Sequence, residues 1–350
     1  RKKMLLGHEK VSFLHLPTPL DYLPAVSRDL GINLYIKRDD MTGLGTGGNK
    51  LRKLEYFLYA AQQAGATALI TVGGPQTNHG RLTAAVAAKY GLKCTIVAVG
   101  AYPGEISANI LLDRMMGCEV YLVQSDGDAS EAELEERAVR EVTEKYKAQG
   151  DTPYFIPMGG SNELGALGYY ECAVEITKQA KEQKIDNARI ISAVGSEGTY
   201  MGLYIGLRDT GSPVRLTGIA ISPSHEPDAA ARAKGYFDQC HDFYKLNWVA
   251  EKEDFDIIND YHWGAYNNPV KEVREAIYYL ARKEAIILDP CYTGKAFYGL
   301  MQMVKTGAIK QGENIIFLHT GGTAGINGPV HRIPMEEDLK DGIIIKKPAK

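Results

Sequence analysis

Cysteine, long apolar runs and excess basic charge are all scarce in this sequence. Its five cysteines are scattered, form no CxxC pair and are odd in number, which argues against a disulfide framework or a zinc site and favours free thiols in a reducing compartment. No apolar run could span a bilayer, and no charged-then-apolar leader opens the chain. The formal net charge of -3 argues against nucleic acid or an anionic membrane as the main partner. We therefore expect a cytoplasmic protein that binds a small molecule and no metal.

The length and the alternation of apolar and helical stretches indicate an α/β protein. The chain has 350 residues, which is longer than a single hydrophobic core usually supports, so two lobes are expected. Short β-rich runs alternate with helical stretches, which is typical of mostly parallel sheets covered by helices. The predicted strands are 34–37, 68–74, 94–100, 119–123, 188–195, 215–222, 285–290 and 314–322. The predicted helices include 81–89, 129–148, 270–283 and 294–305.

Several predicted strands end in glycine-rich turns, and ligands bind beyond the carboxyl ends of parallel strands. The turn AVGSEGTYMG joins a strand to a helix, where unpaired N–H groups and the helix dipole favour a phosphate. It is neither a Walker loop nor a full dinucleotide motif, so a tight structural turn is an equally good interpretation. We expect the side chain of Glu197 to point away from an anion, because a carboxylate repels phosphate. The candidate phosphate-binding residues are Gly195, Ser196, Glu197, Gly198 and Thr199.

Two lysines follow a glycine hinge in the stretch TGGNKLRKLEY. Lys50 and Lys53 are three residues apart and share one face of the predicted helix. A lysine amine forms a Schiff base with an aldehyde cofactor when partial desolvation lowers its pKa. One lysine would then bind the cofactor and the other would hold its charged tail. Two solvated lysines at a helix start are the competing interpretation.

The turn GGPQTNHGR supplies polar side chains where another strand meets a helix. Thr77 or Asn78 would be a sound helix cap, which is the purely structural interpretation. In the functional interpretation, the amide of Asn78 donates a hydrogen bond to a phenolate oxygen of the cofactor, and Thr77 offers its hydroxyl to the substrate. Thr77 and the backbone near Gln76 and His79 would hold the substrate carboxylate, although a histidine such as His79 is more often structural than catalytic.

Two residues near the carboxyl end of the chain complete the candidate set. Tyr292 precedes a predicted helix and is a candidate proton donor or acceptor, although a tyrosine is more often a packing residue. The hydroxyl of Thr320, in place of a carboxylate, would keep a pyridine nitrogen largely unprotonated.

Together these motifs resemble the fold-type II pyridoxal-phosphate enzymes, in particular the group of D-cysteine desulfhydrase and 1-aminocyclopropane-1-carboxylate (ACC) deaminase. The resemblance implies a two-lobed fold, pyridoxal 5'-phosphate as cofactor, an amino-acid substrate and a homodimer. The stretches that carry it extend from near the start of the chain to near its end: LPTPLDYLP, IKRDDMTGLGTGGNKLRKLEY, GGPQTNHGRLTAAVAAKYGLKC, NILLDRMMGCEVYLV, PMGGSNELGALGY, LDPCYTGKAFYGL and IIFLHTGG.

The resemblance also implies which residues hold the cofactor. Lys50 matches the lysine bound covalently to the cofactor, and Lys53 matches a phosphate-binding lysine. Asn78 matches the asparagine at the pyridoxal 3-oxygen, and the loop 195–199 matches the phosphate cup. Thr320 matches the residue near the ring nitrogen in the desulfhydrases.

By the same resemblance, the reaction involves a lysine base and a pair of tyrosines. Lys50, once released from the cofactor, is the expected base. Tyr292 matches an active-site tyrosine, and a second tyrosine is matched best by Tyr266, with Tyr261 as the second choice. Family members usually have serine where this chain has Thr77, whose extra methyl group narrows the substrate side of the pocket.

In this family a smaller lobe is inserted into a larger one, and the cofactor lies in the cleft between them. The resemblance places the small lobe at 51–157 and the large lobe at 1–50 plus 158–350. Closure of such a cleft excludes water from reactive intermediates.

The expected activity is β-elimination from D-cysteine, which yields pyruvate, ammonia and sulfide. ACC deaminases carry a glutamate beside the active-site tyrosine where this chain has Thr293, so ring-opening deamination ranks second. A lyase for another β-substituted alanine, such as L-cysteate with release of sulfite, is an alternative alongside it, whereas a racemase or β-replacement synthase ranks lower. A pyridoxal-phosphate binding protein without turnover ranks last.

Overall fold

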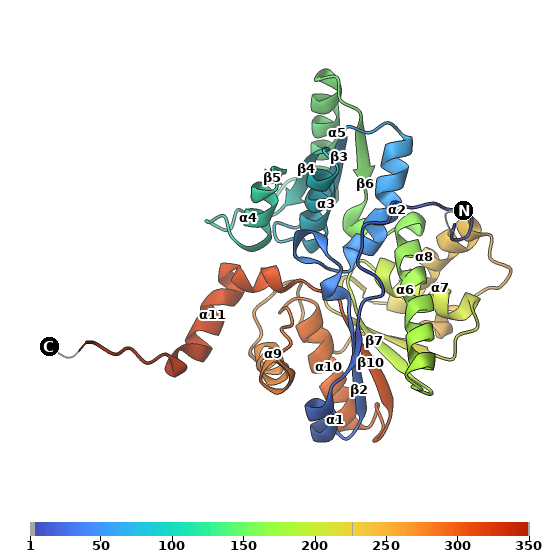
Figure 1. The fold of residues 1–350 in the computed structure, drawn as a ribbon. Coiled ribbons are helices and arrows are strands. Elements are labelled where there is room, and N and C mark those ends of the chain that lie inside the picture. Colours follow the sequence, from blue (N-terminus) through green and yellow to red (C-terminus); the bar gives the residue numbers. More distant parts are fainter. Residues whose placement is uncertain (1–3, 126, 226, 349–350) are drawn as a thin grey trace.

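The computed structural model describes residues 4–125, 127–225 and 227–348, whose strands form two separate sheets (Figure 1). The larger sheet has the strand order β1-β2-β10-β7-β8-β9. Among these strands only β1 runs antiparallel to its neighbour, and the other pairs are parallel. The strands are β1 (Leu20–Tyr22), β2 (Asn33–Arg38), β7 (Arg189–Val194), β8 (Arg215–Ala220), β9 (Ile257–Ile258) and β10 (Asn314–His319).

Helices cover both faces of the larger sheet, as its apolar strands require. In β10, Ile315 and Phe317 pack on the side of α1, α9 and α10, whereas Ile316 and Leu318 pack on the side of α6 and α7. This alternation follows from the period of two along a strand. The helices of this lobe are α1 (Pro24–Leu30), α6 (Glu163–Glu182), α7 (Gly198–Asp209), α8 (Ala229–Tyr244), α9 (Lys271–Glu284), α10 (Thr293–Thr306) and α11 (Pro329–Leu339).

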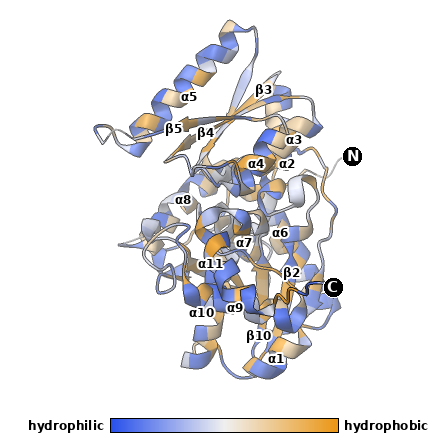
Figure 2. Ribbon diagram, turned by 90° about the vertical axis from the view of Figure 1, so that its left-hand side faces the viewer, coloured by the Kyte–Doolittle hydropathy of each residue, from blue (hydrophilic) through white to orange (hydrophobic). Residues whose placement is uncertain are grey.

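The smaller sheet is fully parallel and forms the upper part of the molecule in Figure 1. Its order is β5-β4-β3-β6, and Figure 2 shows apolar colour along β3 and β4 and mixed colour on the outer helix α5. Its elements are β3 (Ala68–Gly73), β4 (Lys93–Val99), β5 (Glu119–Val123), β6 (Pro153–Ile156), α3 (Asn78–Lys89), α4 (Ala108–Met115) and α5 (Glu131–Ala148).

Helix α2 (Lys50–Gln63) contacts both α3 of the smaller sheet and α6 of the larger one. Strands β3 to β6 fall inside the predicted range 51–157 and the strands of the larger sheet fall outside it, but the division into two lobes stays a prediction. The helix bridges both lobes, so the boundaries near 50 and 157 stay predictions. A Cβ atom on Gly168 of α6 would lie 2.5 Å from the carbonyl carbon of Arg52, which shows how closely the two helix backbones approach.

The structure confirms the α/β class and most of the predicted strands, but the predicted strand 285–290 is wrong. This segment is irregular and forms no ladder, although Ile286 and Leu288 are buried. Pro290 lacks an N–H group, and the carboxylate of Asp289 accepts from the N–H groups of Cys291 and Tyr292, each at 2.8 Å. These bonds turn the chain into α10 and replace a strand ladder.

The cysteines and the helices agree with two further expectations. All five cysteines are free and buried, as the scattered spacing predicted. Within the described ranges, no helix combines the length and the hydropathy needed to cross a membrane.

A buried ion network fixes α2 on the larger lobe. Arg52 forms a two-pronged pair with Asp39, with Nε to Oδ2 at 2.7 Å and Nη2 to Oδ1 at 3.0 Å. Its Nη1 donates to Glu175 at 2.9 Å, and Lys37 donates to the same carboxylate at 2.7 Å. Burial alone would raise the pKa of the Asp39 carboxyl, but Arg52 and Lys37 hold it well below its usual range. Arg52 lies within one helical turn of Lys50, so this network also places the lysine.

We expect the variant Arg52→Ala to lose about 3–5 kcal/mol of unfolding free energy, because it leaves the Asp39 charge buried without its main partner. Chemical denaturation of the wild type and the variant measures the difference. Arg140→Ala is the control, since Arg140 and Glu136 form an exposed pair with side chains 67% and 70% accessible and should contribute less than about 1 kcal/mol. Equal stability of the two variants would contradict the assignment.

Candidate functional site

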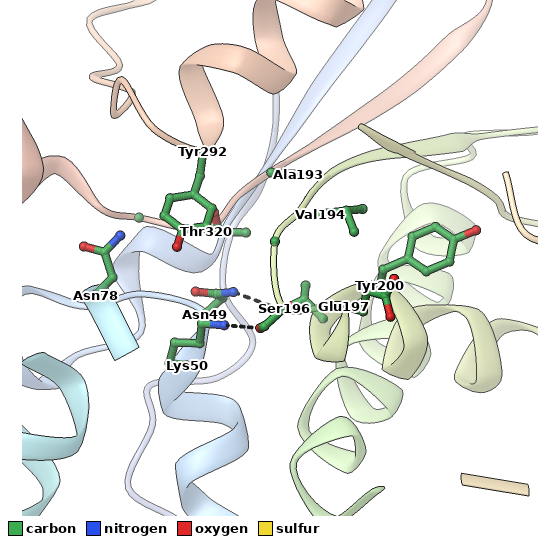
Figure 3. Close-up of a pocket in the computed structure, with 13 residues that line it drawn as sticks. Asn49, Lys50, Asn78, Ala193, Val194, Ser196, Glu197, Tyr200, Tyr292 and Thr320 are labelled. Atoms are coloured by element: carbon green, nitrogen blue, oxygen red, sulfur yellow. Dashed lines mark hydrogen bonds between the residues drawn. The ribbon is translucent and has the colours of Figure 1, made fainter. Parts of the chain in front are cut away.

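A cavity lies where strands of the larger sheet end and α2 begins (Figure 3). It contains about 440 Å³ of empty space, including the part open to solvent. β7 leads into its phosphate-cup loop and β10 leads into Thr320, which agrees with ligand binding at the carboxyl ends of parallel strands. The lining residues are Asn49, Lys50, Asn78, Ala193, Val194, Gly195, Ser196, Glu197, Thr199, Tyr200, Tyr292, Thr320 and Gly321.

Lys50 is the first residue of α2 and projects into this cavity. Its Nζ lies 3.1 Å from the carbonyl oxygen of Gly159 and 3.1 Å from Ser196 Oγ. Burial lowers the pKa of Lys50 to about 8, so a neutral amine is accessible near physiological pH. Gly159 must be a glycine, because its φ is +65° and a Cβ atom there would lie 3.1 Å from Nζ.

Lys53 lies one turn further along α2 and is fully buried. Its Nζ contacts the same Gly159 carbonyl at 3.3 Å and Ser161 Oγ at 3.5 Å. Burial and the neighbouring Lys50 charge lower its pKa well below the usual value. Within the described residues neither lysine forms an ion pair, and buried charges normally have partners. The two lysines are therefore suited to binding an anion.

The loop after β7 presents backbone N–H groups beside these lysines. Glu197 has a left-handed backbone with φ +70° and stands immediately before α7. Its carboxylate lies 3.9 Å from Arg232 Nε, so the charge is balanced by an arginine outside the cavity wall. Ser161 Oγ accepts from the Gly198 N–H at 3.2 Å and lies 2.6 Å from Ser196 Oγ. A helix start next to two buried lysines is an arrangement that favours an anion.

Asn78 is oriented by two donors on its oxygen. Arg81 Nη1 donates to Oδ1 at 2.9 Å and Asn109 Nδ2 donates at 3.1 Å. The acceptor of the amide is thereby occupied, which leaves Nδ2 as the donor that faces the cavity. This is the group that an oxygen on a cofactor ring would accept from.

Tyr292 forms the wall of the cavity across from Lys50 (Figure 3). Its hydroxyl lies 2.6 Å from the hydroxyl of Tyr266, and burial raises its pKa, so it stays protonated at neutral pH. Tyr266 itself is 45% exposed and reaches the cavity through Tyr292. Tyr261 instead packs edge-on against Tyr298, which favours Tyr266 as the second tyrosine.

Thr293 does not line the cavity. It is fully buried, and its hydroxyl donates to Asp289 Oδ1 at 2.6 Å while accepting from the Asp289 N–H at 2.8 Å. Thr320 lines the cavity, and Glu197 is the sole carboxylate among the described lining residues.

The structure does not bring Gln76, Thr77 and His79 to the cavity wall. Thr77 caps α3 by accepting from Gly80 N at 3.1 Å, as its structural interpretation predicted. Gln76 accepts from Asn109 N at 2.9 Å and so holds the start of α4. His79 is buried, with Nε2 2.8 Å from Thr71 Oγ1. Their expected contacts with substrate stay predictions that this geometry does not favour.

Three contributors were missed by the sequence analysis. Asn49 donates to Thr199 Oγ1 at 2.9 Å, Ser161 joins Lys53 to the loop 195–199, and Arg81 orients Asn78. Asn49 and Ser161 stand inside the quoted motifs TGGNKLRKLEY and PMGGSNELGALGY, so a polar side chain beside those glycines was the available signal. Arg81 gave no such signal.

Residues 11–321 match the family described as pyridoxal-phosphate dependent enzyme. This chain belongs to that family. A D-cysteine desulfhydrase of Klebsiella pneumoniae is 38% identical over 325 residues, which cover 91% of this chain and 95% of that protein. A putative 1-aminocyclopropane-1-carboxylate deaminase of Pyrococcus abyssi is also 38% identical, over 92% of this chain and 94% of that one.

The solved structures agree with this placement. A crystal structure of an ACC deaminase homologue superposes with a TM-score of 0.83 at 36% identity, covering 95% of this chain and 96% of that one. The predicted family, fold class and cofactor are thereby confirmed. The homodimer, the cytoplasmic location and the roles of individual site residues stay predictions.

The cavity fits pyridoxal phosphate in its charge and in its donors. A primary amine with a lowered pKa suits the aldehyde, and the unpaired lysine beside a helix start suits the phosphate. The residues that would hold the cofactor are Lys50, Lys53, Asn78, Gly195, Ser196, Glu197, Gly198, Thr199 and Thr320.

In the cofactor-free protein, we expect Lys50 to lose its proton with a midpoint near pH 8, because burial disfavours the ammonium form. Competitive reductive methylation followed by peptide mass spectrometry measures this midpoint. Labelling of Lys50 should rise steeply through pH 8. A midpoint near the ordinary lysine value of about 10.4 would contradict the assignment.

Proposed function

We propose that this protein is a β-elimination lyase that converts D-cysteine, or a closely similar amino acid, to pyruvate, ammonia and sulfide. Support comes from the relative named D-cysteine desulfhydrase, which is 38% identical over 325 residues. We also propose that the chain works as a cytoplasmic homodimer.

The observation that carries this choice is that no carboxylate among the described lining residues is available to the cofactor ring nitrogen. ACC deaminases place a glutamate beside the active-site tyrosine, whereas Thr293 is turned to Asp289 at 2.6 Å. The described cavity wall offers the hydroxyl of Thr320 instead, and its one carboxylate, Glu197, lies near Arg232. A neutral group beside the ring nitrogen supports elimination, because elimination requires less electron withdrawal by the cofactor ring than ring opening does.

Bound pyridoxal phosphate supplies an electron sink for the pair of electrons left when the Cα proton departs. Lys50 would take that proton on Nζ, since its lowered pKa provides a neutral amine. Tyr292 would donate from its hydroxyl to the leaving group, and Tyr266 at 2.6 Å would share its proton. Lys53 and the loop 195–199 would hold the phosphate, and Asn78 Nδ2 would hold the ring oxygen.

ACC deamination is the second candidate, because the Pyrococcus abyssi relative is named as a putative ACC deaminase. A lyase for L-cysteate is an alternative alongside it, whereas a racemase or β-replacement synthase and a protein without turnover rank lower. A substrate panel separates these activities.

We expect a substrate panel to show pyruvate and sulfide from D-cysteine without a second substrate. The panel contains D- and L-cysteine, D- and L-cysteate, D-serine, β-chloroalanine and ACC, and keto acid, sulfide and sulfite are measured. Sulfite from cysteate would identify the sulfo-lyase. Release of 2-oxobutyrate from ACC at a higher kcat/KM than pyruvate from D-cysteine would overturn the proposal.

We expect Lys50→Ala to lose the visible absorbance of the bound cofactor and its borohydride-fixed mass adduct, together with keto acid release. The exposed residue Lys89 provides the control Lys89→Ala, which should keep both signals. An unchanged adduct in Lys50→Ala would show that a different amine binds the cofactor.

We expect Tyr292→Phe to retain the cofactor adduct but to lower kcat by roughly 10²–10⁴-fold, the usual contribution of a positioned proton donor. Steady-state kinetics with D-cysteine and β-chloroalanine test this. The loss should be smaller with β-chloroalanine, because chloride leaves without a proton. An equal loss with both substrates would contradict the role of Tyr292 as leaving-group acid.

A further inference from the structure

Lys295 carries a buried ammonium group that the proposed mechanism does not use. It lies in the first turn of α10 and is fully buried. The start of a helix is the unfavourable end of its dipole for a cation, so capping does not explain a lysine here. Burial lowers its pKa, and Asp289 and Cys291 oppose that shift only in part.

Four neutral oxygens surround this ammonium group. Nζ donates to the carbonyl oxygens of Ile221 at 2.9 Å, His262 at 2.9 Å and Ala265 at 2.7 Å, and to Oδ1 of Asn268 at 2.8 Å. The four oxygens compensate the desolvated charge by dipoles alone. A ring of carbonyl and amide oxygens at hydrogen-bond distance is also the kind of site that binds a monovalent metal cation.

Three of these oxygens belong to the loop 259–269, which carries Tyr266. His262 and Ala265 precede the tyrosine and Asn268 follows it. The loop folds back at the left-handed residue Trp263, with φ 60°, and Asn268 Nδ2 donates to the Trp263 carbonyl at 2.8 Å. The ammonium therefore ties both flanks of Tyr266 to α10.

The same helix start carries the partner of Tyr266. Tyr292 immediately precedes α10, three residues before Lys295, and its hydroxyl lies 2.6 Å from that of Tyr266. Tyr266 is 45% exposed, and its ring packs edge-on against that of Tyr292. Its position depends on what holds the loop.

We infer that Lys295 is a positioning residue whose ammonium acts as a built-in monovalent cation, which holds the loop 259–269 and thereby places Tyr266 against Tyr292. The link to catalysis rests on the proposed function, whereas the hold on the loop does not. Removal of the side chain should leave an oxygen cage that an external ammonium or potassium ion can fill.

Trp263 provides a probe of the loop that is independent of the reaction. The chain has two tryptophans, and Trp248→Phe leaves Trp263 as the sole tryptophan, which is excited selectively at a wavelength that tyrosine does not absorb. In this background, Lys295→Ala should shift the Trp263 emission and lower kcat at least roughly tenfold, with the cofactor adduct on Lys50 retained. Ammonium or potassium chloride should reverse both changes, and choline chloride at the same ionic strength should reverse neither. The control is Lys305→Ala, an exposed lysine of the same helix.

Each outcome has a defined meaning. The inference would be overturned if Lys295→Ala had the same Trp263 emission as the control variant. It would also be overturned if neither ammonium nor potassium restored the emission and the activity of Lys295→Ala. If emission shifts and recovers but kcat never changes, the cage is supported and the proposed role of Tyr266 in the reaction fails.

A second variant keeps the test decisive if Lys295→Ala does not fold. Asn268→Ala removes one of the four oxygens and leaves the ammonium in place. We expect faster amide hydrogen exchange across 259–269 and a smaller shift of Trp263 emission than in Lys295→Ala. Exchange identical to that of the wild type would overturn the inference as well.

Discussion

The ion pair between Arg52 and Asp39 sets the position of α2, and with it the shape of the cavity. It ties α2 to the larger lobe within one turn of Lys50, and Gly168 lets α6 approach the same turn closely. A buried pair of this kind contributes little net stability compared with apolar packing, but it specifies one position because each charge is costly without the other. A displaced α2 would move both cavity lysines away from the loop that follows β7.

From that position the charges of the cavity follow. Lys50 and Lys53 share the carbonyl of Gly159 and lack an ion-pair partner within the described ranges. Burial lowers the pKa of both lysines, and the charge of Lys50 lowers that of Lys53 further. The backbone N–H groups at the start of α7 add to the positive potential. This concentration of positive potential is unfavourable in the absence of a ligand, and a bound anion would compensate it. The oxygen of Asn78 accepts two hydrogen bonds, which fix its amide nitrogen toward the same space.

The side of the cavity formed by Tyr292 is built differently, from neutral hydroxyl groups that buried ions hold in place. Asp289 gathers the backbone N–H groups of Cys291, Tyr292 and Thr293 and thereby ends an apolar segment and starts α10. This places Tyr292 in the wall and turns Thr293 out of it. Lys295, one turn later, holds the loop that brings Tyr266 to Tyr292. Asp289 and Lys295 therefore position Tyr292 and Tyr266 without lining the cavity themselves.

Local patterns in the sequence were enough to predict the α/β class, the parallel strands and the paired lysines, because apolar periodicity, glycine turns and residue spacing are all visible along the chain. The capping of α3 by Thr77 was predictable in the same way. The family was predicted from the resemblance of the chain's motifs to those of known enzymes. The folded chain was needed to learn that 285–290 forms no strand, that His79 lies outside the cavity wall, and that Ser161, Arg81 and Lys295 support the site. Those outcomes depend on contacts between segments distant in sequence, such as Lys295 with Ile221, and on competition for hydrogen bonds that no single segment reveals.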